Sequence, residues 1–121
     1  MRKNLKYKVI LSSILFALSL IGAILILFYL PAKQIIIFYG DSCSHCASLE
    51  EYLTQNKASE KINFVRKEVS NSPENSQQLA DLAKVCNLPT DNIALPFVWD
   101  GNNCYQGEQS ALDFFKKKIS D

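Results

Sequence analysis

Hydrophobic residues form one long unbroken run near the N-terminus and several short, periodic groups after it. The run extends from Val9 to Leu30 without a charged residue. A helix of roughly 22 residues crosses a hydrocarbon core of about 30 Å. We therefore predict a basic N-region at 1–8, a transmembrane anchor at 9–30, a linker at 31–34 and one domain at 35–121.

A cleaved signal peptide is the alternative for this segment, because such peptides also begin with a basic region. The apolar run is longer than the usual hydrophobic region of about 7–15 residues. A cleavage site ending at Ala32 would need a small residue two positions earlier, and that position is Leu30. Both features favour an uncleaved anchor.

The apolar positions of the domain predict its elements. Ile35–Tyr39 is apolar throughout, as in a strand buried on both faces. Helical spacing follows in about 44–56, and a second, less buried strand is expected at 62–69. Ser72 and Pro73 are typical of a helix start, and the helical pattern continues to Cys86.

Two short apolar segments, from Leu95 to Tyr105, then flank an Asp-Gly pair and predict a hairpin. A capping box at Ser110–Asp113 opens the last predicted helix. The order β-α-β-α-β-β-α predicts an α/β fold, a four-stranded mixed sheet with helices on both faces.

The basic residues around the apolar run predict the orientation of the chain in the membrane. The four basic residues before the run, against Lys33 alone soon after it, place the N-terminus in the cytoplasm and the domain outside a cell membrane crossed once. The part after the run has nine basic and twelve acidic residues, a net charge of −3. Such a weak charge predicts no nucleic-acid-binding surface.

Cys43-Ser44-His45-Cys46 follows the first strand at the start of a helix. The N–H groups and the dipole at a helix N-terminus favour a thiolate, the species that attacks disulfides. His45, the only histidine, could lower the pKa of Cys43 further, or could be an exposed residue without a special role. Redox exchange is the favoured reading, and a metal site or an inert bridge are the alternatives.

The second cysteine pair, Cys86 and Cys104, allows three interpretations. A structural disulfide between them would contribute about 3 kcal/mol by loop closure. The two cysteines could instead be free thiols or a second redox relay. An oxidising compartment favours pairing in general.

The element order, the Cys-x-x-Cys at the first strand–helix junction and the proline before the third strand resemble the thioredoxin fold in its compact, glutaredoxin-sized form. The resemblance covers nearly all of residues 34–119. The segment Leu95–Trp99 with Tyr105–Ser110 is also similar to the thioredoxin-like domain of some vitamin K epoxide reductase homologues.

The resemblance implies that Cys43 is the nucleophile and Cys46 the resolving thiol. It also implies that Pro96 is a cis-proline whose loop pairs with substrate backbone, and that Leu95 contacts the substrate. The middle residues Ser44-His45 are similar to those of disulfide isomerases and oxidases in having histidine before the second cysteine. Several relatives have proline where Ser44 stands.

We thus expect a membrane-anchored extracytoplasmic thiol–disulfide oxidoreductase that needs neither an organic cofactor nor a metal. Its expected partners are cysteine-containing exported proteins and a membrane enzyme that resets the dithiol. The alternatives are a reductase for haem attachment or metal loading, and a non-enzymatic metal carrier that uses Cys43 and Cys46.

Overall fold

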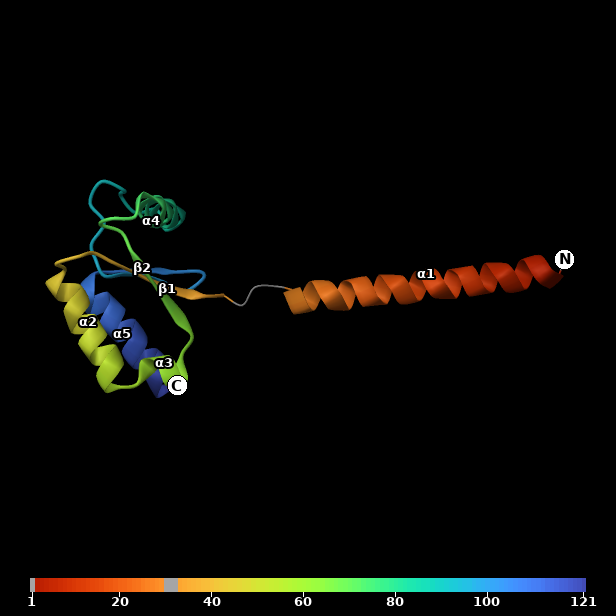
Figure 1. Cartoon of the computed structure of the whole chain (residues 1–121), viewed down its shortest axis with the longest axis horizontal. Helices are drawn as coiled ribbons and strands as arrows, with labels where there is room; N and C mark the ends of the chain where they lie inside the picture. The colour runs from red at the N-terminus through yellow and green to blue at the C-terminus, as the bar shows by residue number, and fades with distance from the viewer. Residues whose placement is uncertain (1, 30–32) are drawn as a thin grey trace. The chain divides into compact units, whose positions relative to one another are not determined.

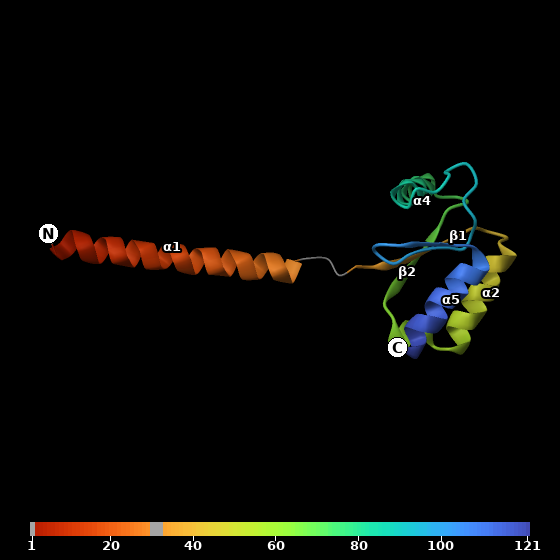
Figure 2. The ribbon, with the colours of Figure 1, turned by 180° about the vertical axis from the view of Figure 1, so that it is seen from behind.

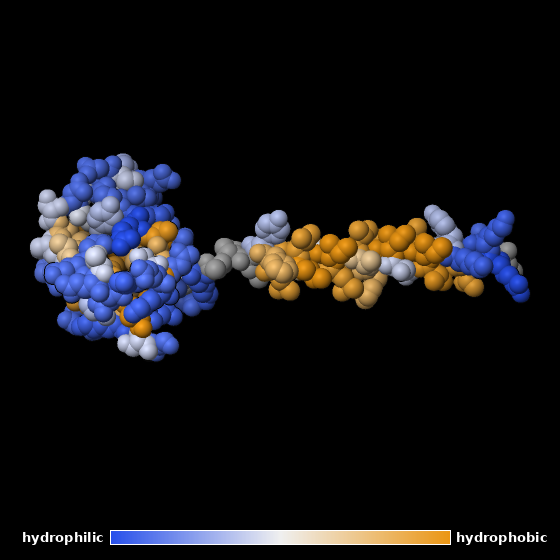
Figure 3. All heavy atoms as spheres, turned by 60° about the horizontal axis from the view of Figure 1, so that its bottom comes forward, coloured by the Kyte–Doolittle hydropathy of each residue, from blue (hydrophilic) through white to orange (hydrophobic). Residues whose placement is uncertain are grey.

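The structure, a computed structural model, describes residues 2–29 and 33–121, which belong to two units. The first unit is helix α1 (Arg2–Tyr29), whose 28 residues span about 42 Å. Figure 3 shows hydrophobic residues along most of this helix and hydrophilic residues at one end, and the sequence places four basic residues at the N-terminal end. Of the helices described, it alone is long and apolar enough to cross a membrane. The helix includes most of the predicted basic N-region, whereas residues 30–32, from the predicted anchor end and linker, lie outside the described residues.

The second unit contains the four-stranded mixed sheet that the sequence predicts. Its strands are β1 (Ile35–Tyr39), β2 (Phe64–Glu68), β3 (Phe97–Trp99) and β4 (Cys104–Gln106). The order across the sheet is β2-β1-β3-β4. Strand β1 is parallel to β2 and antiparallel to β3, and β3 forms a hairpin with β4. The continuous apolar strand is therefore central.

Helices cover both faces of the sheet, as expected (Figures 1 and 2). Helices α2 (Ser44–Gln55), α3 (Ala58–Lys61) and α5 (Gly107–Ser120) pack on one face. Helix α4 (Pro73–Val85) packs on the other. Alternate residues of β1 point to opposite faces, so both faces receive apolar side chains from the same strand.

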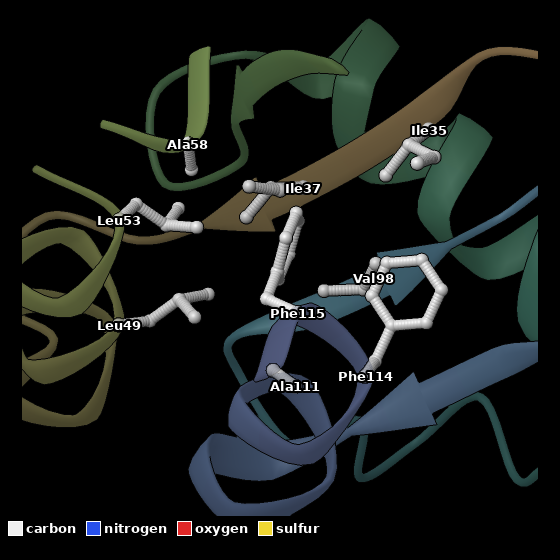
Figure 4. Packing of buried hydrophobic residues seen from close by; sticks show 9 residues of the cluster. All are labelled: Ile35, Ile37, Leu49, Leu53, Ala58, Val98, Ala111, Phe114 and Phe115. Atoms are coloured by element: carbon white, nitrogen blue, oxygen red, sulfur yellow. The ribbon is translucent and has the colours of Figure 1, made fainter. Parts of the chain in front are cut away.

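The larger core lies beneath α2 and α5 (Figure 4). Phe115, fully buried on α5, lies against Ile37 of β1, and its ring meets the edge of Phe64 with 5.4 Å between centroids. Leu49 and Leu53 of α2 complete this contact at helical spacing. Packing of α2 and α5 against β1 thereby fixes the N-terminal ends of these two helices beside the cysteine motif.

The last helix begins earlier than predicted. Its first residue is Gly107, so the capping box predicted at Ser110–Asp113 is wrong. Gly107 has φ +80°, a conformation that glycine adopts without strain. Its N–H also donates to the Pro96 carbonyl oxygen at 2.9 Å. Strand β4 therefore turns directly into α5.

Smaller differences follow from local backbone geometry. Helix α3 was not predicted, because four residues are too few for helical periodicity to be detected. Helix α3 ends at Lys61, just before the range expected for the second strand, and that strand begins at Phe64 rather than Ile62. Ser72 does cap α4, accepting a hydrogen bond from the Asn75 N–H at 3.3 Å.

Candidate functional site

The cysteine motif lies where the central strand passes into α2. Cys43 is the residue before the first turn of α2, and Cys46 is one turn into the helix. The two form a disulfide with their Cα atoms 5.2 Å apart. Cys43 is half-buried, whereas Cys46 is only 5% exposed, so an incoming thiol reaches the sulfur of Cys43 more easily.

One backbone N–H group is directed at the sulfur of Cys43. The Cys46 N–H donates to Cys43 Sγ at 3.2 Å, in the way that a hydroxyl caps a helix. A sulfur in this position benefits from the unpaired N–H groups and the partial positive charge of the helix start. The same geometry would stabilise a thiolate once the disulfide is reduced.

The turn before the motif is held to the loop after β2. The Asp41 N–H donates to Ser70 Oγ at 2.9 Å, and Asn71 Nδ2 donates to Asp41 Oδ2 at 2.5 Å. Gly40 permits this approach, since a Cβ there would lie 3.1 Å from Ser70 Oγ and 3.2 Å from Leu95 Cδ1. Leu95 is thereby brought beside the cysteine turn from a distant part of the chain.

Pro96 follows Leu95 through a cis peptide bond and is fully buried. Its loop is tied to the start of α5 by the Gly107–Pro96 hydrogen bond described above. The Ala94 N–H also donates to Gln106 Oε1 at 3.1 Å. The structure thus holds the Leu95–Pro96 segment between the cysteine turn and the start of α5.

His45 pairs with an acidic residue that the sequence analysis did not select. Its Nδ1 lies 2.5 Å from Glu108 Oε2, across 63 residues of sequence. The hydrogen bond from His45 is the main reason that the pKa of Glu108 lies below its ordinary value. Burial opposes this shift, and a hydrogen bond from Ser48 supports it. The His45 side chain is 68% exposed and that of Glu108 33% exposed. The pair joins α2 to α5 beside the disulfide.

Ser44 is exposed and begins α2, and its carbonyl oxygen accepts a hydrogen bond from Ser48 Oγ at 3.4 Å. The signal that could have led to Glu108 is its place in the first turn of α5, where an acid suits the helix dipole. Sequence alone started that helix at Ser110 and left Glu108 in a loop.

Two hollows flank the disulfide. One, of about 500 Å³, is lined by Tyr39, Gly40, Ser42, Cys43, Ser44, Cys46, Ala47 and Glu50. The other, of about 410 Å³, is lined by His45, Ala94, Leu95, Gly107, Glu108 and Gln109. A third hollow, of about 160 Å³, lies far from the cysteine motif at the end of α5. The first hollow leaves open space beside Cys43, and the second lies beside His45 and Leu95.

The other two cysteines form a second disulfide. Cys86, at the end of α4, and Cys104, the first residue of β4, have Cα atoms 6.2 Å apart. The bridge encloses the segment that carries Pro96 and β3. Both cysteines are half-buried, and Cys104 packs against the core beneath α4.

Within residues 2–29 and 33–121, no cysteine is free and no group of three or more His, Cys, Asp or Glu side chains could hold a metal ion. The site therefore consists of the Cys43–Cys46 disulfide, the Leu95–Pro96 segment and the His45–Glu108 pair. No protein-family model and no curated protein matches this chain in sequence.

Proposed function

We propose that residues 35–121 form a thioredoxin-like domain that exchanges disulfides with the thiols of other proteins. The observation that carries this proposal is the Cys43–Cys46 disulfide at the N-terminus of α2, with the Cys46 N–H directed at Cys43 Sγ. A reversible dithiol needs one sulfur that is reachable and stabilised as a thiolate, and one that is shielded. The exposures of Cys43 and Cys46 match these two roles.

In the oxidising direction, a client thiolate attacks Cys43 Sγ. The electron pair of the Cys43–Cys46 bond leaves on Cys46 as a thiolate, and a mixed disulfide joins the client to Cys43. A second client thiolate then attacks the client sulfur, so that Cys43 leaves as a thiolate stabilised by the start of α2. The client has lost two electrons and the dithiol has gained them.

In the reducing direction the same bonds form in reverse order. The Cys43 thiolate attacks a client disulfide, and Cys46 then attacks Cys43 and releases the reduced client. Leu95 and Pro96 would hold the client chain extended beside Cys43, as the family resemblance implies. His45 favours the oxidising direction, because a partial positive charge near Cys43 stabilises the reduced thiolate.

We further propose that α1 anchors the domain on the outer face of a membrane, with the basic residues 2–8 in the cytoplasm. Its length and composition support the span, and the basic residues support the orientation. A membrane enzyme that resets the dithiol is the partner expected from the resemblance.

The test of direction is the reduction potential of the Cys43–Cys46 pair, measured on the detergent-solubilised full chain in graded glutathione buffers. The Cys86→Ala/Cys104→Ala variant should give the same potential, which assigns it to the first pair. A value of about −120 to −180 mV supports disulfide formation or isomerisation, and one near −270 mV supports a reductase. A pair that never exchanges with glutathione contradicts the proposal.

A trapping experiment tests the chemistry itself. Cys46→Ser leaves a mixed disulfide unresolved, so client proteins should remain linked to Cys43 on non-reducing gels. Cys43→Ser is the matched control and should trap none. Tight Cu(I) or Zn(II) binding by the wild type, with no trapping, would favour the metal carrier instead.

A further inference from the structure

One end of the domain is defined by where its strands begin. Strands β1 and β2 are parallel, with Ile35 opposite Phe64, so they begin at the same edge of the sheet. Helix α3 ends just before β2, and α5 runs back toward this edge from the end of β4. Ile119 packs against the core cluster that contains Ala58, and α3 lies beside the C-terminal end of α5 (Figure 1). We call this the basal end.

The basal end is rich in lysine. Its six lysines are all exposed and come from three segments: Lys33 before β1, Lys57 and Lys61 at α3, and Lys116, Lys117 and Lys118 near the end of α5. In the described part of the chain the ion pairs are His45–Glu108, Arg66–Glu50 and Lys84–Asp81, which include none of the six. Lys33 Nζ donates one hydrogen bond, to Asn102 Oδ1 at 2.7 Å, and its other two N–H groups face no acceptor in the described residues. None of the six amines is therefore neutralised by an acidic side chain of the domain.

The charge of the domain is polarised. Three acids, Glu60, Asp100 and Asp121, share the basal end, which leaves six minus three, or +3. Residues 33–121 have nine basic and twelve acidic residues in all, so the remainder, with three basic and nine acidic, carries −6. The acidic remainder includes the rim of the disulfide site, where Glu50 and Glu108 line the two hollows.

The covalent chain limits how far the basal end can be from the end of α1. Lys33 follows Tyr29 by four residues, which span at most about 14 Å when fully extended. This bound holds for any angle between the two units. Electrostatic attraction to a charged surface acts over a Debye length of about 8 Å at physiological salt. If α1 spans a membrane, Lys33 is within or close to that range of the headgroups.

We propose that the basal end is a docking surface for the anionic phospholipid headgroups of the membrane that α1 spans. Lysine ammonium groups bind phosphate as flexible point charges, and three segments supply them around the point where the chain leaves the bilayer. The acidic remainder would be repelled by the same headgroups. Docking would therefore turn the disulfide, at the other end of β1, toward the solvent. The inference stands on the lysines and the tether, and it does not need the dithiol to be an enzyme.

The test is lysine reactivity in the full chain reconstituted into nanodiscs. One set contains phosphatidylcholine alone and the other includes about one third phosphatidylglycerol, which supplies the negative surface potential. Brief acetylation with a water-soluble ester, read by mass spectrometry, measures each lysine separately. We expect Lys33 and Lys61 to react at least about threefold more slowly in the anionic discs, and high salt to remove the difference. Lys67, on β2 near the disulfide end, is the internal reference and should not change.

Matched variants separate charge from shape. Changing Lys116, Lys117 and Lys118 together to glutamine should remove most of the protection of Lys33 and Lys61, whereas changing all three to arginine should preserve it. All three side chains are exposed, so both variants should fold, and their urea midpoints are compared as a check. Equal reactivity of Lys33 in both discs would overturn the proposal. So would protection in the anionic discs that high salt does not remove, because it would indicate a contact that does not depend on the headgroup charge.

Discussion

The disulfide between Cys86 and Cys104 makes the most quantitative prediction about this domain. It joins the end of α4 to the first residue of β4, which are 18 residues apart in sequence. Reducing this bond leaves the folded contacts nearly unchanged but releases the unfolded chain from a closed loop. The effect should therefore appear chiefly as a larger entropy of the unfolded state.

The loop length sets the magnitude. For a loop of 18 residues, the cross-link lowers the entropy of the unfolded chain by about 11 cal/mol/K, which is about 3 kcal/mol of stability at 25 °C. Small domains lose about 1–3 kcal/mol of stability per molar urea. Reduction should therefore lower the urea midpoint by about 1–3 M.

The assay uses the Cys43→Ala/Cys46→Ala variant, so that Cys86–Cys104 is the only disulfide. The full chain is unfolded in detergent with and without dithiothreitol, and Trp99 reports the transition as the single tryptophan. Trp99 packs against the core beneath α4 and pairs with Cys104 across the hairpin. Because a nearby disulfide can quench tryptophan, each redox state is fitted with its own baselines.

Two results would refute this reasoning. Oxidised and reduced midpoints that agree within about 0.3 M would mean that the loop closure contributes almost nothing. Two reactive thiols in the unfolded, unreduced variant would mean that the cross-link does not form.

The remaining predictions concern packing, backbone and pH. Phe115→Ala removes a fully buried ring from its contact with Phe64, and should cost about 3–5 kcal/mol in urea unfolding. Gly101→Ala should destabilise the domain by more than about 1 kcal/mol in the same assay, because Gly101 has φ +95° and a Cβ would lie 2.6 Å from that of Lys33. For Asp100, burial raises the pKa, but hydrogen bonds from the N–H groups of the following turn outweigh it, and the pKa lies below its ordinary value. The contribution of Asp100 to stability should thus be complete above its unfolded pKa of about 4 and be lost as the pH falls through its folded pKa. Urea midpoints measured from pH 7 to pH 3 would show this loss. The Asp100→Asn variant should lack it.

Each of these has a result that contradicts it. Val85→Ala, at a side chain that is 64% exposed, should change stability by less than about 0.5 kcal/mol, and an effect equal to that of Phe115→Ala would undermine the core assignment. If Gly101→Ala left the stability unchanged, the turn would have to change its conformation readily. If the urea midpoints of Asp100→Asn and the wild type fell equally between pH 7 and pH 3, Asp100 would not contribute to the pH dependence of stability.

The sheet and the apolar helix could be predicted from sequence because their signals are local. Five consecutive apolar residues identify β1, and Ser72-Pro73 identifies the start of α4. The pairing of His45 with Glu108 could not be predicted, because it joins two helix starts that only the folded sheet brings together. The same holds for Cys86 and Cys104, whose separation in space depends on how α4 lies on the sheet.

The start of α5 was misplaced for a physical reason as well. Ser110 has a good capping sequence, yet the conformational freedom of Gly107 and its hydrogen bond to the Pro96 carbonyl begin the helix earlier. A tertiary contact thus outweighed a local preference. That shift of three residues is what places Glu108 beside His45.

The central position of β1 also determines when the domain can fold during synthesis. Ile37 pairs with Arg66 on one side and Val98 on the other, which follow it by 66 − 37 = 29 and 98 − 37 = 61 residues. A nascent chain that has just released α1 therefore exposes an apolar strand that has no partner until β2 has been made, and only one partner until β3 follows. Cys43 and Cys46, only three residues apart, can be oxidised during that interval, whereas Cys86 and Cys104 meet only once the sheet is complete. Oxidation in the order of synthesis pairs the first cysteine with the second and the third with the fourth, so the native pairing is reached without reshuffling.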